Sequence, residues 1–469
     1  MYLNNLTRIF KKNLILIFSI PIVLNYVINL ITNSNFLNNF NIVKLVSFIL
    51  GTIFFLNLSQ MLNKIFAFGG KALSLVYFLS SFFVFDVIFL FITKNISFKY
   101  NIIFISSIWI VLFLYKSKNL IDLFKISFLF FVYRIFNFFF IDNLVNNSTY
   151  KELNTDVPVQ WFKLSSLIYE NNYFFALQNN LIPGQGLLPS YIQALLLQIG
   201  FNTEIFQFIQ INSYLFLSFS ILFITDLKIS KKNKILTSLT LTTFLFNNDW
   251  LKYLLINSLM IEGIVSFFIG VLIFNYLRMS KIQNLKSFFF FLTFGGMVLT
   301  KNFISLISLI VIISSIFFIK RNYYILAGFL VFGANLAYQN IYFLSYQNFA
   351  YTSEIPFRDL LFDLLFFRNL DFINIYDIIN QLLIDKPISY LIFIFLSVNL
   401  IDILNNKKQF SQEIFILLFV LTNYVLINLL YISYWKNVEI ESSYRYFISC
   451  FHLIFSSLII HLSKFEKIK

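Results

Sequence analysis

Long apolar runs recur along the whole chain and restrict its fold more than any other feature. They are about 17 to 25 residues long, enough for a helix to cross a hydrocarbon layer about 30 Å thick. The 469 residues are 59% hydrophobic and only 12% charged, whereas soluble domains contain roughly 25% charged residues. The runs lack the alternation of apolar and polar residues found in the strands of a membrane barrel. The sequence therefore predicts an all-α, polytopic helical membrane protein with roughly 12 to 16 transmembrane helices.

The placement of the positive charge predicts a topology. The net charge is +14, and the lysines and arginines stand in short clusters between apolar runs, as expected of cytoplasmic loops. Arg8, Lys11 and Lys12 precede the first run, and the tail SKFEKIK follows the last. We therefore expect both termini in the cytoplasm, the lipid bilayer as a partner, and no binding of nucleic acid.

The apolar runs and the charges between them divide the chain into spans and loops. Segments 146–189 and 346–387 are polar enough to be external loops, and the first is expected to contain amphipathic helices. The stretch 187–200 is short for a span and is expected to be a partly inserted or tilted helix. The expected spans are 13–32, 41–61, 72–93, 102–115, 122–142, 205–225, 235–248, 261–277, 287–299, 302–319, 322–345, 388–405, 411–432 and 446–463.

The scarcity of cysteine and histidine excludes several kinds of site. The one cysteine, Cys450, leaves no partner for an intramolecular disulfide and no cysteine-built metal site. The two histidines, His452 and His461, are too few for a histidine cluster, and we expect His452 to pack in the interior. No phosphate loop, dinucleotide fingerprint or zinc spacing occurs. We expect neither a metal nor a cofactor.

Short motifs follow one another from about Phe128 to the C-terminus. They are TDVPVQWFKLSSLIYENNYFFALQNNLIPGQGLLPSYIQALLLQIGF in the first external loop, NDWLKYLLINSLMIEG at a later turn, GGMVLTKNF, and EIESSYRYF before the last span. In their order and common sidedness they resemble the GT-C fold membrane glycosyltransferases, which take sugars from polyprenyl-phosphate carriers. The resemblance implies a GT-C-like transmembrane region over residues 122–469. Residues 1–121 would be N-terminal transmembrane helices outside it.

Asp156 matches the acidic residue that this family carries in its first external loop. The resemblance implies that Asp156 is the catalytic base, because an acceptor hydroxyl or amine becomes a better nucleophile as it loses its proton. Many members have two adjacent acids at this place, whereas Asp156 stands between Thr155 and Val157. The alternative is a turn or helix-capping aspartate before Pro158.

The other site residues implied by the resemblance would bind substrate. Arg445 with Tyr446 resembles the element that faces the lipid-linked phosphate, and a guanidinium matches two phosphate oxygens. Lys301 is a second candidate for phosphate, and Glu262 and Glu441 are acids near the same external face. Each has a plainer alternative: Arg445 and Tyr446 as an interfacial anchor, Lys301 as a lysine snorkelling to the interface, and Glu262 as a carboxylate turned to water.

These expectations describe an inverting glycosyltransferase of the bacterial inner membrane. Its donor would be a sugar on a polyprenyl phosphate, and its acceptor a glycan, a lipid or a protein at the external face. The first alternative is a cell-surface polysaccharide polymerase or ligase, which should carry external arginines, and Arg358 and Arg368 fit that requirement. The second is a polytopic transporter, which should show internal repeats, and none is visible in the sequence.

Two charged residues lie deep within predicted spans outside the main motifs. Asp86 and Arg134 stand in apolar runs, where an isolated charge is unfavourable by at least ~2.5 kcal/mol. The sequence predicts that they pair with each other in a structural role, with a proton relay as the alternative.

Overall fold

The computed structural model describes part of the chain, and every regular element in that part is an α-helix. The described residues are 39–66, 69–93, 96–117, 120–136, 162–178, 188–198, 216, 218–247, 262–278, 394–400, 420–421 and 450–467. Their main helices are α3 (Asn39–Phe66), α4 (Lys71–Thr93), α5 (Phe98–Ser117), α6 (Leu120–Phe136), α8 (Phe162–Glu170), α9 (Tyr173–Gln178), α10 (Leu188–Gln198), α12 (Lys231–Asn247), α14 (Glu262–Arg278) and α23 (Phe451–Lys467). No strand occurs among these residues, so the predicted all-α class is confirmed for this part of the chain.

The helices lie where the apolar runs predicted them. α4 and α14 coincide almost residue for residue with the expected spans 72–93 and 261–277. In segment 146–189, α8 is amphipathic as expected, because Leu164 and Ile168 are buried while Lys163 and Glu170 are exposed. The sequence pattern therefore located these helices correctly.

Within the described residues, two helices are long and apolar enough to cross a membrane. The qualifying stretches are Ile49–Phe66 in α3 and Phe98–Lys116 in α5. Two shorter apolar stretches, Lys71–Phe83 in α4 and Phe451–Ile460 in α23, fall below the length of a full span. The expected number of crossings stays a prediction.

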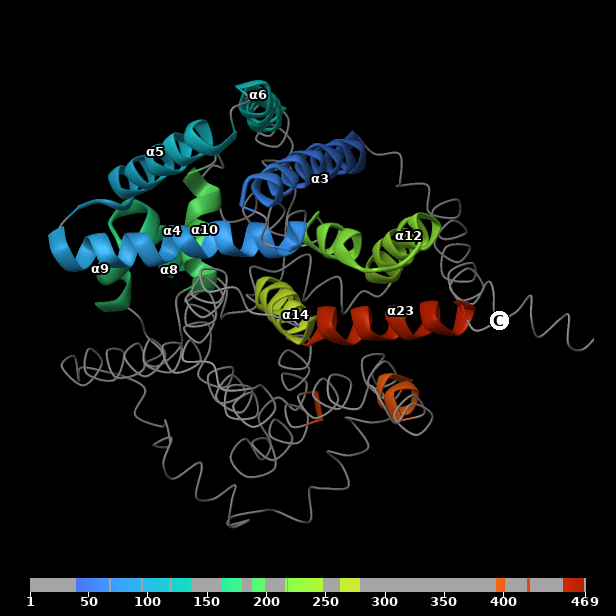
Figure 1. Cartoon of the computed structure of the whole chain (residues 1–469). Helices are drawn as coiled ribbons and strands as arrows, with labels where there is room; N and C mark the ends of the chain where they lie inside the picture. The colour runs from blue at the N-terminus through green and yellow to red at the C-terminus, as the bar shows by residue number, and fades with distance from the viewer. Residues whose placement is uncertain are drawn as a thin grey trace, which may run out of the picture.

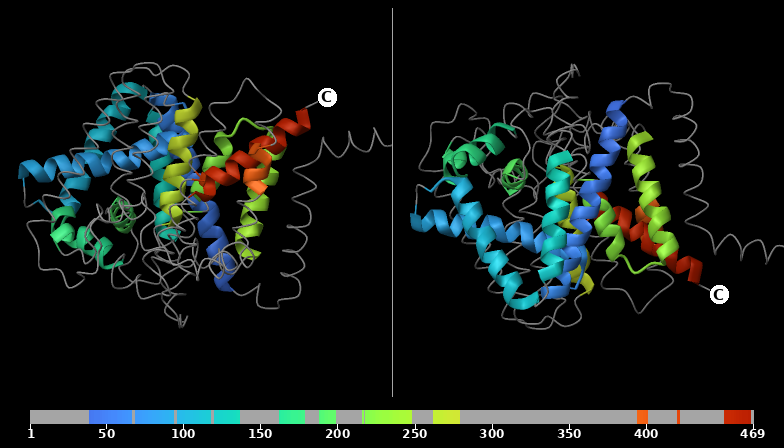
Figure 2. Two further views of the ribbon diagram at one scale, coloured as in Figure 1. Left: turned by 90° about the horizontal axis from the view of Figure 1, so that it is seen from below. Right: turned by 90° about the horizontal axis from the view of Figure 1, so that it is seen from above.

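The helices are not all aligned. α3, α6, α12 and α14 run in roughly the same direction, while α4 and α23 cross that direction (Figures 1 and 2). α3 packs on both α4 and α6, α14 packs on α23, and α10 packs on α8. α4 thereby connects the group of α8, α9 and α10 with the group that contains α12, α14 and α23.

The start of α4 is capped by a residue from a distant part of the chain. Gly69 has a φ of 100°, a left-handed conformation that glycine adopts without the steric penalty of other residues. The first turn of α4 has free backbone N–H groups, and the Asp226 carboxylate accepts from two of them: Lys71 N at 2.9 Å and Ala72 N at 2.7 Å. This cap joins α4 to the end of the helical segment 218–226.

Aromatic rings form the centre of the helix packing. Phe55 of α3 meets Phe219 edge to face with ring centroids 5.2 Å apart, and Phe219 stacks on Phe267 of α14 at 4.8 Å. Phe267 in turn contacts the His452 ring of α23 at 5.9 Å. Offset and edge-to-face pairs add to the stabilisation from area burial. Segments far apart in sequence are therefore joined through ring contacts.

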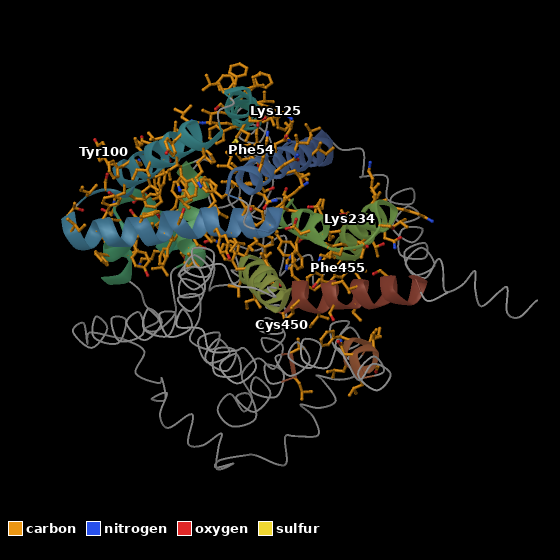
Figure 3. The ribbon with its side chains drawn as sticks, viewed as in Figure 1. Phe54, Tyr100, Lys125, Lys234, Cys450 and Phe455 are labelled. Atoms are coloured by element: carbon orange, nitrogen blue, oxygen red, sulfur yellow. The ribbon has the colours of Figure 1, made fainter. Side chains whose placement is uncertain are left out.

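The outer surfaces of α5 and α6 are apolar. On α6, Phe124, Phe128 and Phe131 are 74%, 57% and 59% exposed, and their spacing places them along one side of the helix. α5 exposes Ile103 and Val111 in the same way. Figure 3 shows the α6 side chains projecting from the top of the molecule, where Lys125 is labelled. A water-soluble monomer rarely exposes so large an apolar surface, whereas a lipid-facing helix does.

Candidate functional site

Most of the predicted site residues lie outside the described residues. These are Asp156, Lys301, Glu441, Arg445 and Tyr446, and the predicted external loop 346–387 lies there as well. Their roles stay predictions.

Glu262 is the predicted site residue that can be placed. It is the first residue of α14, as expected of an acid at a helix start, and only its backbone is described. Because a helix N-terminus carries partial positive charge, a carboxylate there is electrostatically favourable.

A buried histidine, His452, joins the first half of α14 to the start of α23. The His452 Nδ1 atom lies 2.8 Å from Ser266 Oγ, and its Nε2 atom lies 2.7 Å from Ser220 Oγ. The backbone N–H of His452 also donates to Ser266 Oγ at 3.1 Å. The prediction that His452 packs in the interior is confirmed, since its side chain is 2% exposed.

The hydrogen bonds determine which ring nitrogen of His452 carries the proton. Ser220 donates its one hydroxyl proton to the Phe216 carbonyl at 2.8 Å, so its oxygen accepts from Nε2–H. Nδ1 is then the acceptor of the neutral ring, and Ser266 donates to it while accepting from the His452 backbone. Every donor and acceptor in this network is satisfied by one tautomer. The network therefore fixes the junction of the three helical segments and leaves no ring nitrogen free for a base.

Two glycines of α14 allow this close packing. A Cβ atom at Gly270 would lie 2.7 Å from His452 Cβ and 3.3 Å from the Leu453 backbone nitrogen. A Cβ at Gly263 would lie 2.9 Å from the Phe216 ring. The two glycines stand seven residues apart and so on one face of the helix. Small residues at such positions let helices approach closely in membranes.

The junction joins two helices that begin at, or shortly after, predicted site residues. Ser266 follows Glu262 by one helical turn on α14, and His452 lies shortly after Arg445 and Tyr446 in the sequence. Their hydrogen bonds hold the N-terminal part of α14 beside the beginning of α23. The first half of α14, which begins at Glu262, therefore lies beside the start of α23, and α23 follows Arg445 and Tyr446 in the sequence.

A second polar group lies at the Asp226 cap, outside the predicted spans. Burial raises the pKa of Asp226, while the backbone donors Lys71 and Ala72 and the charges of Lys71 and Lys234 oppose that rise. Burial lowers the pKa of Lys234, partly offset by the Asp226 charge. The Lys234 ammonium donates to the Thr225 carbonyl. The arrangement ties α4, α12 and the 218–226 segment together at one end.

The predicted pair of Asp86 and Arg134 is wrong. Asp86 is completely buried and neither of its oxygens has a hydrogen-bond partner, whereas Arg134 is exposed on α6. The physical reason is the helix packing, because Asp86 lies near Asn101 of α5 and Tyr191 of α10, while α6 packs on α3. Apolar context alone suggested a partner but could not identify which helix faces the carboxyl.

Several residues of these networks could not be identified from the sequence. Ser220 and Ser266 are separated from His452 by 232 and 186 positions, and neither stands in a motif. The sequence contained one indication that a residue such as Asp226 was needed. Gly69 and Gly70 precede α4 without a serine, threonine, asparagine or aspartate to cap it, so an acceptor from elsewhere was needed.

Comparison with known proteins gives no match to this chain among protein-family models, curated proteins or solved structures.

Proposed function

We propose that this chain is a multi-span membrane glycosyltransferase that transfers a sugar from a polyprenyl-phosphate carrier to an acceptor at the external face of a bacterial inner membrane. The observation that carries the proposal is the junction of α14 and α23. It holds the first half of α14, which begins at Glu262, beside the start of α23, a few residues after Arg445 and Tyr446 in the sequence. An acid and a phosphate-binding arginine on neighbouring segments are what transfer from a lipid-linked phosphate requires.

The membrane part of the proposal is supported by the outer surface of the helices. α5 and α6 expose large aliphatic and aromatic side chains along their lengths, and α3 and α5 contain stretches long enough to span a bilayer. Lipid contact accounts for both features, because acyl chains cover apolar side chains without a protein partner. A chain of roughly 12 to 16 such helices follows from the full set of apolar runs.

The sidedness is supported by contacts between helix ends. Lys64 at the end of α3 pairs with Asp122 at the start of α6 at 2.8 Å, and the charge pattern assigns both to the cytoplasmic side. Phe98 at the start of α5 donates its backbone N–H to the Asn171 carbonyl at 2.7 Å, and both are expected outside. Contacts that mixed the two sides would oppose the topology.

The proposed reaction is a direct displacement at the anomeric carbon. The acceptor loses its proton to Asp156 and forms the new bond to the sugar, while the sugar's bond to phosphate oxygen breaks. The electron pair of that bond leaves with the polyprenyl phosphate, and Arg445 with Lys301 stabilises its charge. Tyr446, Glu262 and Glu441 complete the binding surface.

The test is transfer from a radiolabelled polyprenyl-phosphate sugar in membranes, normalised to protein level. Asp156→Asn should lower transfer by about a hundredfold or more, given general-base contributions of about 10² to 10⁴. The matched control is Asp122→Asn, which removes a carboxylate whose structural role is the ion pair with Lys64. Arg445→Lys should weaken use of the donor more than use of the acceptor, because it loses the two-pronged contact.

Two outcomes would change the proposal. If Asp156→Asn retains near-normal transfer, Asp156 is not the base and Glu262 becomes the next candidate. If the wild-type protein consumes no polyprenyl-linked sugar, the enzyme proposal fails and a transporter becomes the better hypothesis.

A further inference from the structure

A completely buried carboxyl lies in the interior between α4, α5 and α10. The Asp86 side chain is 0% exposed, and neither of its oxygens makes a hydrogen bond of ordinary geometry. Two polar side chains lie near it, Asn101 and Tyr191. The Nδ2 atom of Asn101 is also buried without a hydrogen-bond partner, and the Tyr191 hydroxyl donates to the Phe82 carbonyl at 3.1 Å. The carboxyl is therefore shielded from solvent beside two groups that can hydrogen-bond to it.

No cation compensates this carboxyl from the described residues of the helices around it. α10 contains no charged residue, and the described α14 side chains, residues 263–271, are uncharged. On α5, Lys99 is exposed and lies over the Tyr169 ring at 4.6 Å. Lys71 lies at the other end of α4, where its backbone N–H donates to the Asp226 carboxylate. Among the described residues there is also no group of three or more metal-ligating side chains.

An ionised carboxylate in this position would be strongly unfavourable. Moving an unpaired charge into the bilayer interior is disfavoured by at least ~2.5 kcal/mol on insertion scales, and burial inside protein costs several kcal/mol for each ion. Binding a proton removes the charge and needs no cavity. We propose that Asp86 is a proton-binding site, held as the neutral acid at neutral pH in the native protein.

The neutral acid fits the hydrogen-bonding capacity of its neighbours. Tyr191 gives its own proton to the Phe82 carbonyl, so its oxygen keeps a lone pair that can accept from the acid O–H. Asn101 Nδ2 can donate to the other carboxyl oxygen. The result is one chain of donors from Asn101 through Asp86 and Tyr191 to Phe82. Loss of the proton would turn Tyr191 from Phe82 toward the carboxylate and so change how α10 is attached to α4.

Infrared spectroscopy of the full chain in lipid vesicles, with ¹³C-labelled aspartate, distinguishes the acid from the carboxylate. The wild type should show the C=O band of a protonated aspartic acid at about pH 7, where an ordinary aspartate with a pKa near 3.9 is almost fully ionised. Asp86→Asn should remove this band. The control Asp122→Asn should remove carboxylate absorption instead, because Asp122 is ion-paired and partly exposed.

A second variant tests the assigned partner independently. Tyr191→Phe removes the acceptor of the acid O–H, so the wild-type acid band should shift in the direction of a weaker hydrogen bond. The proposal is overturned if Asp86→Asn removes a carboxylate band and leaves the acid region of the spectrum unchanged. It is also overturned if that carboxylate band depends on sodium or potassium, because Asp86 would then bind a metal cation in place of a proton. An acid band that keeps its position in Tyr191→Phe would overturn the assignment of Tyr191.

Discussion

Ser266→Ala should weaken the junction of α14 and α23 more than Ser220→Ala does. Ser266 makes two hydrogen bonds to His452, one to the ring Nδ1 and one from the backbone N–H. Ser220 makes one bond to the ring, and its own proton goes to Phe216 within the same helical segment. The alanine at 266 therefore leaves both a buried acceptor and a buried donor unsatisfied.

The magnitude follows from these lost bonds. Polar contacts between membrane helices average ~0.6 kcal/mol, so two of them give about 1.2 kcal/mol. A buried polar group left unsatisfied adds about 1 to 3 kcal/mol. Ser266→Ala leaves two such groups and Ser220→Ala leaves one, so at the lower end of this range we expect the free energy of unfolding to fall by about 3 kcal/mol and about 1.6 kcal/mol, respectively. A change of about 2 kcal/mol is roughly a 30-fold change in the ratio of folded to unfolded protein.

The chain contains its own reporter for this measurement. Cys450 is its one cysteine, is 2% exposed and stands two positions before His452. In detergent, a thiol-reactive dye should label Cys450 as the junction opens, and the denaturant midpoint of labelling should order the variants as wild type, Ser220→Ala, Ser266→Ala. Equal midpoints for Ser266→Ala and the wild type would refute the hydrogen-bond assignment.

A double variant separates lost hydrogen bonds from lost packing. His452→Phe keeps a ring among Phe216 and Phe267 but removes both ring nitrogens. Replacing both partners of a buried hydrogen bond by apolar groups is far less destabilising than replacing one. The combination of Ser266→Ala with His452→Phe should therefore lose less stability than the sum of the single changes. Strict additivity would contradict a direct bond between the two side chains.

Other variants test the remaining contacts with the same labelling assay. Gly270→Ala should destabilise by about 1 to 3 kcal/mol through overpacking, because its Cβ would lie 2.7 Å from His452 Cβ; a wild-type midpoint would contradict this close packing. Asp226→Ala should cost about 1 kcal/mol through loss of the helix cap. Burial raises the pKa of Asp226 in the folded protein. Proton binding by Asp226 therefore stabilises the fold at pH values below the ordinary aspartate pKa, and this contribution to the free energy of unfolding is lost as the pH rises through the folded pKa. Asp226→Asn should make the free energy of unfolding less dependent on pH. Lys64→Ala should change stability by less than about 1 kcal/mol because its ion pair with Asp122 is exposed, and a larger loss would point to further contacts.

The positions of the helices were predictable from the sequence because span length and apolar periodicity are local properties. α4 and α14 followed directly from their apolar runs, and Glu262 was expected at a helix start. Which helix faces which is a non-local property. Asp86 illustrates the difference, since its burial was predicted but its neighbours, Asn101 and Tyr191, come from helices that no local pattern connects to it. Asp156, Lys301 and Arg445 lie outside the described residues, and their roles stay predictions.

The polar contacts of the described helices differ between the helix ends and the interior. At the ends assigned to the cytoplasm the polar contacts are charged, as in the pair of Lys64 with Asp122 and the cap of Asp226. In the interior they are neutral, as in the buried bonds of His452 with two serines. Neutral buried networks with every group satisfied make helix junctions rigid. If Arg445 binds the lipid-linked phosphate as proposed, a rigid start of α23 a few residues later in the sequence would restrict the positions open to that arginine, which transfer from a lipid-linked donor requires.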